Sequence, residues 1–140
     1  LNNFVVENDA LLVVIDTTLE DGQPRHDVLD VVEVCPRPSL LRTRQDRYNR
    51  TLAYAVCYGS GEIFVVDVAD AQVVDRIDGG GGPHDFVIVP DAPGVPETIR
   101  GFGFLANFGE HTIGVVDLRE DSPTYHQLIG RIGWPEELER

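Results

Sequence analysis

The chain has 140 residues, and its 24 acidic and 11 basic side chains give a formal net charge of -13. This balance excludes nucleic-acid binding through a basic patch, and the 42% hydrophobic content excludes a disordered acidic tail. The sequence contains no apolar run of the roughly 18 residues that a membrane-spanning helix needs, so we expect no transmembrane segment.

Short runs rich in Val, Ile, Phe and Tyr follow one another along the chain, each bounded by Gly, Pro, Asp or Asn. Helical signals are nearly absent. The expected strands lie at residues 4–6, 11–15, 28–34, 40–43, 52–57, 63–68, 73–77, 86–89, 102–106, 113–118 and 127–132. Many short strands at nearly even spacing predict an all-β fold.

The strands belong to an internal repeat of about 50 residues. Val-Ile-Asp at residues 14–16 recurs as Val-Val-Asp at 65–67 and again at 115–117. The segment 53–59 recurs in similar form at 103–109. Each period holds four short strands, which is typical of one blade of a β-propeller.

The repeats resemble the YVTN-type β-propeller family. Residues 104–118 match its strand of aromatic, aliphatic and small residues ending in Asn, then a Gly turn and a Val/Ile strand ending in Asp. Residues 80–91 resemble its Gly-Gly-Pro-His element, which closes on Pro-Asp. The second repeat departs from the pattern, because Cys57 stands where the family prefers Asn, and the first keeps only the Val-Ile-Asp element.

The resemblance implies a β-propeller segment of about 2.75 four-stranded antiparallel blades. Residues 1–35 would form three strands of a partial blade, 36–79 and 80–134 two complete blades, and 135–140 a polar tail. Because one blade buries its faces only against its neighbours, we expect partners. They would be the remaining propeller blades, from an upstream segment or another chain, or further copies of this chain.

In the family's blade order, one face of the disc gathers the loops most suited to binding. We expect a small ligand-binding site there, formed by His84, Asp85, Asn107, Glu110 and His111. Two imidazoles and two carboxylates would also suit a divalent cation. The alternative is that the histidines are structural, and we predict no cofactor and no catalytic residue.

The same blade order places Cys35 and Cys57 close together, Cys35 between an outer and an inner strand and Cys57 at the end of the adjacent second strand. We therefore expect a disulfide, which would indicate an oxidising compartment. Two buried thiols are the alternative.

Repeated charged residues suggest two further roles. Asp16, Asp67 and Asp117 each end a third strand, where we expect them to cap turns rather than bind calcium. Five arginines in 14 positions form a local basic segment that could receive an acidic partner or pair with nearby acids such as Asp46. They are Arg37, Arg42, Arg44, Arg47 and Arg50.

These features predict a binding or scaffold module within an extracytoplasmic propeller, in the periplasm or on the cell surface of a bacterium or archaeon. One alternative is the propeller subunit of a metal- or haem-dependent redox enzyme with a channel-facing histidine. Another is an oligomeric structural protein of an envelope or filament. Fold alone does not choose among them.

Overall fold

The computed structural model describes residues 10–133, so the strand expected at 4–6 and the tail expected at 135–140 lie outside the described residues. The described chain is all-β, as the sequence predicts. Its strands are β1 (Ala10–Ile15), β2 (Leu19–Glu20), β3 (Gln23–Pro24), β4 (Val28–Val34), β5 (Pro38–Gln45), β6 (Thr51–Cys57), β7 (Glu62–Asp67), β8 (Gln72–Asp78), β9 (Pro83–Ile88), β10 (Phe102–Asn107), β11 (Thr112–Asp117) and β12 (Leu128–Ile132).

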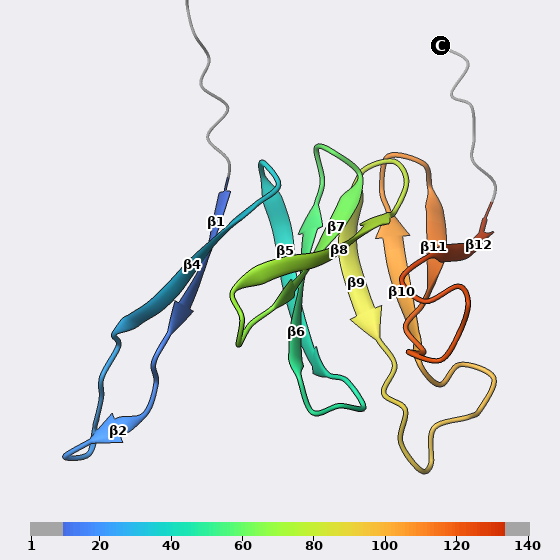
Figure 1. Cartoon of the computed structure of the whole chain (residues 1–140). Coiled ribbons are helices and arrows are strands. Elements are labelled where there is room, and N and C mark those ends of the chain that lie inside the picture. The colour runs from blue at the N-terminus through green and yellow to red at the C-terminus, as the bar shows by residue number, and fades with distance from the viewer. Residues whose placement is uncertain (1–9, 134–140) are drawn as a thin grey trace, which may run out of the picture.

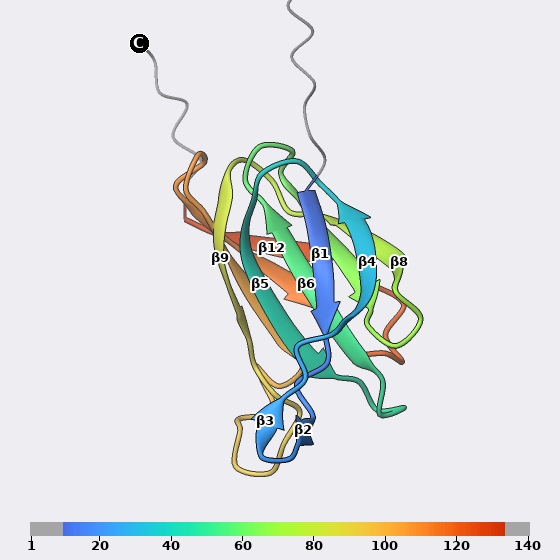
Figure 2. The ribbon, with the colours of Figure 1, turned by 90° about the vertical axis from the view of Figure 1, so that its left-hand side faces the viewer.

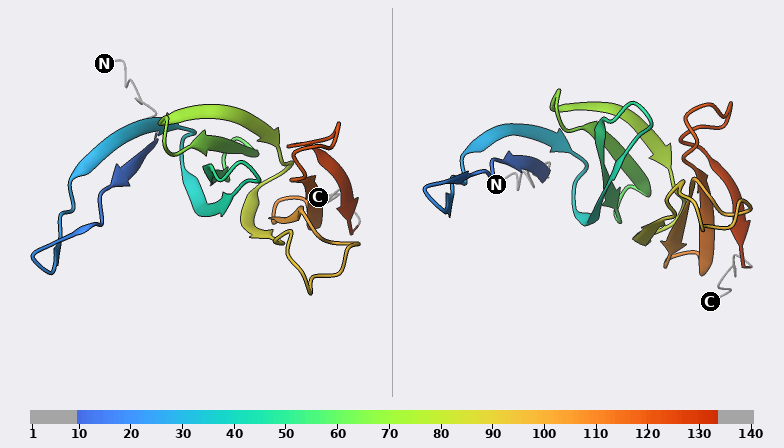
Figure 3. Two further views of the ribbon diagram at one scale, coloured as in Figure 1. Left: turned by 60° about the horizontal axis from the view of Figure 1, so that its bottom comes forward. Right: turned by 90° about the horizontal axis from the view of Figure 1, so that it is seen from below.

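The strands form successive antiparallel sheets along an arc (Figures 1 and 3). We call the pair β1–β4 the first sheet, β5–β6–β7–β8 the middle sheet and β9–β10–β11–β12 the last sheet. Strands β5 and β9 lie toward the concave side of the arc, and β4 and β8 follow its convex side (Figure 3). The two four-stranded sheets have the arrangement expected of propeller-like blades.

A recurrent β-bulge shows that all three sheets repeat one pattern. The ladder shifts register between Val14 and Ile15 in β1, and between Val65 and Val66 in β7. It shifts again between Val115 and Val116 in β11. By this register β1 corresponds to β7 and β11, and β4 corresponds to β8 and β12. The first sheet therefore repeats the outer half of the other two.

Apolar residues at alternate positions of β6 and β7 face the last sheet and build the larger core. Leu52, Tyr54, Val56, Ile63 and Val65 are at most 1% exposed. They pack against residues of the last sheet and of its β11–β12 connection, namely Phe86, Leu105, Val116 and Leu118. Burying one such side chain contributes about 1.5–3 kcal/mol, so this contact fixes the two sheets against each other.

The opposite side of the middle sheet carries smaller residues and packs against the first sheet. Ala53 and Ala55 lie beside Phe64 and Val66 there, and they contact Val32 of β4. Because both sides of β6 are covered, six of its seven residues are buried. Figure 2 views the arc from the first-sheet end and shows β1 and β4 in front of β5 and β6.

A small hairpin between the first-sheet strands was not expected from the sequence. Strands β2 and β3 pair through Leu19 and Glu20, and Asp21 and Gly22 form the turn at φ 52° and 78°. Two successive positive φ angles match a type I′ turn, for which Asp-Gly is a preferred pair. The dipeptide was a usable signal, but the flanking strands are only two residues long.

Candidate functional site

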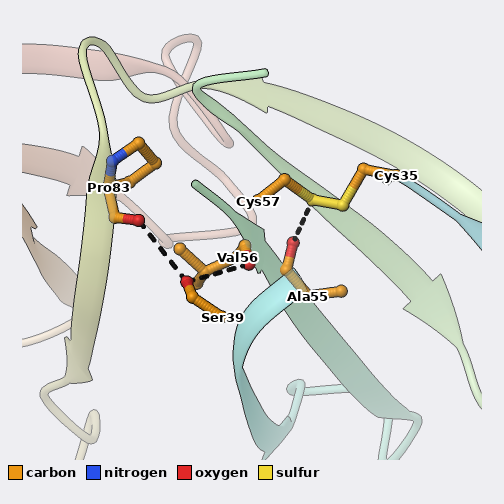
Figure 4. Close-up of a disulfide and its surroundings, with 6 residues drawn as sticks. All are labelled: Cys35, Ser39, Ala55, Val56, Cys57 and Pro83. Carbon is orange, nitrogen blue, oxygen red and sulfur yellow. Dashed lines mark hydrogen bonds between the residues drawn. A yellow bond between two sulfur atoms is a disulfide. The ribbon is translucent and has the colours of Figure 1, made fainter. Parts of the chain in front are cut away.

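Cys35 and Cys57 form a disulfide at the edge of the molecule where β4 passes into β5 (Figure 4), which confirms the sequence expectation. Their Cα atoms are 6.1 Å apart. Cys35 lies just beyond β4, and Cys57 ends β6 in the middle sheet. The bond therefore ties the first sheet to the middle sheet.

Ser39 adds a second fastening close to the disulfide. Its hydroxyl donates to Val56 O at 3.2 Å and lies 3.4 Å from Pro83 O of β9 (Figure 4). Ser39 on β5 thus contacts its own sheet and the inner strand of the next one. Ser39 follows Pro38 as His84 follows Pro83, so the two residues hold the same position in successive inner strands.

Asn107 fastens the next joint of the arc. Its side-chain amide donates to Gly79 O at 2.8 Å, on the connection between β8 and β9. The turn there has positive φ angles at Gly80 and Gly82, 104° and 63°. An ideal Cβ on Gly80 would lie 3.1 Å from Asn107 Nδ2 and from both Glu110 carboxylate oxygens. The glycine-rich run 79–82 therefore forms the close connection into β9.

Three of the five predicted ligand residues meet at one shallow hollow of about 270 Å³ on the open side of the last sheet. His84 comes from β9, Asn107 from the end of β10, and His111 from the turn that follows. Phe108 and Ile113 also line it and are 69% and 43% exposed. The hollow therefore combines two imidazoles with apolar walls.

The other two predicted ligands make contacts elsewhere. The Asp85 carboxylate accepts from Arg42 Nη2 at 3.1 Å, across the joint between the middle and last sheets. Glu110 accepts from the backbone N–H of Gly81 at 2.6 Å and also lies 3.4 Å from Arg131 Nε. Both carboxylates hold loops or sheets in place.

The basic segment is spread between the two larger sheets. Arg42 also donates to Phe86 O at 3.0 Å, and Arg44 pairs with Glu120 at 3.0 Å. Arg47 lies 3.7 Å from Asp121. Within the middle sheet, Arg50 pairs with Asp46 at 2.7 Å. Arg37 is exposed on the β4–β5 connection.

A chain of polar side chains, centred on the buried Tyr54 and His126, crosses the same joint and was not predicted from the sequence. Tyr54 Oη accepts from Arg44 Nε at 2.9 Å and lies 3.0 Å from His126 Nε2. The other imidazole nitrogen of His126 lies 2.9 Å from Asp75 Oδ2 of β8. The Tyr125 ring stacks on His126 with centroids 3.7 Å apart. These side chains, five in all, link the middle sheet to the β11–β12 connection of the last sheet.

Burial shifts the protonation of this chain. It lowers the pKa of His126 below its ordinary value, against the opposing effect of the Asp75 carboxylate. It likewise raises the pKa of Tyr54, although the adjacent Arg44 favours the phenolate. Burial thus favours the neutral imidazole of His126, which can accept at one ring nitrogen and donate at the other and so bridge the Tyr54 phenol and the Asp75 carboxylate.

The three repeated aspartates cap turns, which confirms that expectation. Asp16 accepts from Thr18 N at 2.8 Å, and Asp67 from Ala69 N at 3.1 Å. Asp117 accepts from Arg119 N at 3.0 Å and also from the hydroxyls of Ser122 and Thr124. These hydrogen bonds hold the pKa of Asp117 well below its usual range, despite its burial.

No family model matches the chain, and no curated protein matches it. Within residues 10–133, no group of three or more His, Cys, Asp or Glu side chains is placed to hold a metal ion. The same residues include no helix long and apolar enough to cross a membrane.

Proposed function

We propose that the chain is a binding and scaffold module, an arc of an extracytoplasmic YVTN-like β-propeller that recognises a protein or ligand. The observation that carries this proposal is the repetition of one sheet pattern along the arc, with the same bulge in all three sheets. Such units form a rigid surface on which connecting loops are displayed for recognition.

The fastening of the two joints supports the scaffold role. The disulfide Cys35–Cys57 holds the first joint, and the Asn107 hydrogen bond to Gly79 O holds the second. Binding surfaces that are rigid before binding lose less conformational entropy on association.

The chemistry of the hollow favours a protein partner over a redox cofactor. Asp85 and Glu110 are occupied by Arg42, Gly81 and Arg131. His84 and His111 are left beside the exposed rings and methyl groups of Phe108 and Ile113. A hollow with apolar walls and two imidazoles suits a bulky apolar side chain of a partner protein.

A peptide-display selection against the full chain tests recognition at this hollow. We expect enriched peptides with an apolar anchor, whose binding is lost with Phe108→Ser and kept with Tyr48→Ser. Tyr48 is a suitable control because it is similarly exposed, at 66%, on the β5–β6 loop. Peptides that ignore Phe108→Ser would overturn recognition at the hollow.

Titrations with Cu²⁺, Zn²⁺ and haemin separate the scaffold from the redox alternative. Calorimetry and visible absorption of the full chain are expected to give no stoichiometric complex. A stoichiometric complex that is abolished by both His84→Gln and His111→Gln would replace the scaffold with a cofactor site.

The disulfide supports placing the protein outside the cytoplasm, because such bonds persist in oxidising compartments. Alkylating free thiols in the cells that naturally make the protein, before lysis, tests this placement. We expect the two cysteines to resist alkylation until a reductant is added, and labelling of both without reductant would overturn the placement.

A further inference from the structure

We infer that the open side of the last sheet docks the first sheet of a second copy of this chain, head to tail. This inference deepens the proposed scaffold function by naming its partner, and it rests on the arc described above. Its basis is that the covered side of the middle sheet recurs on the open side of the last sheet, and that the outer-strand part of the surface covering it recurs on the first sheet.

The first half of that joint is the covered side of the middle sheet. Its Tyr54, Ile63 and Val65 are fully buried. The ladders place Phe104, Ile113 and Val115 at the same positions in the last sheet. These residues face away from the middle sheet, and Ile113 is 43% exposed. The open side of the last sheet therefore carries an apolar surface like the one on the middle sheet, which the other side of the last sheet covers.

The second half of the joint is the side of the last sheet that packs on the middle sheet. It includes Val116, buried at 0%, and Leu128, which is partly buried in the same core. The bulge register places Ile15 and Val28 at the same positions in the first sheet. There they are 47% and 60% exposed. The first sheet therefore presents an uncovered copy of the outer-strand part of this second half.

A histidine recurs in the same place and strengthens the correspondence. His126 N donates to Asp117 O, and His26 N donates to Asp16 O, at 2.8 and 2.9 Å. Both histidines have positive φ angles, 59° and 56°. In the internal joint the His126 ring meets the Tyr54 ring edge-on, with centroids 5.7 Å apart. His26 is exposed. In the proposed contact, Phe104 of another copy takes the place beside His26 that Tyr54 has beside His126.

The contact joins two different surfaces, so it is heterologous. Such a contact closes into a ring if the rotation between copies permits and otherwise extends as a filament. In either case, blocking one surface of a copy leaves its other surface able to bind.

Two one-sided variants test the inference by sedimentation velocity of the full chain. Ile113→Arg blocks the open side of the last sheet, and Val28→Arg blocks the first sheet. We expect the unmodified chain to associate with rising concentration, each variant to stay monomeric, and an equal mixture of the two to form a dimer. Val74→Arg changes an equally accessible valine, 48% exposed on the outer strand β8, and should associate like the unmodified chain.

The outcomes separate this inference from the proposed function. An unmodified chain that remains monomeric throughout the concentration series overturns the head-to-tail contact, as does a mixture of folded variants that forms no dimer. Unchanged circular dichroism and thermal unfolding would establish that the variants are folded. In the mixture, His26→Ala on the Ile113→Arg copy should weaken the dimer about fivefold, as for loss of an aromatic pair. Because Ile113 lines both the hollow and the proposed contact, the display and titration experiments are repeated on the Val28→Arg variant, in which the open side of the last sheet stays uncovered. Loss of recognition in that variant on Phe108→Ser then reports on the proposed function alone, whatever the sedimentation result.

Discussion

Cys57 and Asn107 occupy the same place in successive sheets, yet they fasten the arc by different chemistry. Each ends its second strand and pairs with the proline that opens the inner strand, Pro38 for Cys57 and Pro83 for Asn107. Cys57 is bonded covalently to Cys35, whereas Asn107 donates a hydrogen bond to Gly79 O. A covalent bond and an amide hydrogen bond thus serve one structural position.

The equivalence predicts that one fastening can replace the other in part. Changing both cysteines to Ala should cost about 3 kcal/mol of unfolding free energy, the usual effect of closing a loop of this size. The pair Cys35→Gly with Cys57→Asn should recover about 1 kcal/mol through a new amide hydrogen bond. Urea unfolding of the three proteins measures this, and equal stability of the two variants would contradict it.

Tyr54→Phe should destabilise the protein by about 1–3 kcal/mol, because the hydroxyl accepts from Arg44 and contacts His126 in a buried joint. The phenyl ring preserves the apolar packing, so the loss isolates the polar chain. Tyr48→Phe, at an exposed position, is the matched control and should be neutral. Denaturant unfolding measures the stability of both variants, and equal effects would show that the hydrogen bonds of the Tyr54 hydroxyl contribute nothing to stability.

His126 should make stability fall as the pH drops. Its pKa is lowered in the folded protein, mainly by burial, so below about pH 6.5 the unfolded chain binds the proton more readily. Its contribution is complete above that pH and declines as the pH falls toward the folded pKa. His126→Gln should flatten the dependence of the thermal midpoint between neutral and mildly acidic pH. Equal slopes of the thermal midpoint against pH in the two proteins would contradict this assignment.

Asp117 should control stability at lower pH. Its pKa is held well below the usual range by hydrogen bonds from Arg119, Ser122 and Thr124. Its stabilisation is therefore complete above about pH 4 and is lost as the pH falls toward the folded pKa. Asp117→Asn should lower stability at neutral pH by about 1–3 kcal/mol and reduce the acid sensitivity. Equal slopes of unfolding free energy against pH would contradict this assignment.

Gly103→Ala should destabilise the joint between the middle and last sheets. A Cβ at this position would collide with the buried Phe86 ring, and overpacking of this kind costs about 1–3 kcal/mol. Gly130 on β12 is the matched control, since no atom lies within 4 Å of its Cβ position. Thermal unfolding should separate the two alanine variants, and similar midpoints would show that Phe86 can move aside.

Element type and order could be predicted because each strand carries its own local signal. The Val-Ile-Asp repeat located β1, β7 and β11, and Gly-Gly-Pro-His located the turn into β9. Strand β5 runs to Gln45, past the expected end at residue 43, because Arg44 and Gln45 continue to pair with β6. Polar residues on an exposed strand give little periodic signal, which is why the predicted strand ended too early.

For the candidate site, the sequence predicted which residues lie near one another but not which contacts they make. Blade order brought His84, Asn107 and His111 to one hollow, but it did not predict that Asp85 and Glu110 would be held by Arg42 and Gly81. The arginine segment illustrates the same limit. Its composition identified a basic stretch, whereas its acidic partners Glu120 and Asp121 lie in a different repeat.

The sequence by itself determined the all-β class and the repeat, and it predicted the turn-capping aspartates and, with two buried thiols as the alternative, the disulfide between Cys35 and Cys57. All of these depend on side-chain alternation and on neighbours within a repeat or at its border. The tertiary structure decided which side chains meet between sheets, such as Tyr54 with His126. Those contacts depend on how twisted sheets rotate and stack against one another, and a strand's own residues do not encode that geometry.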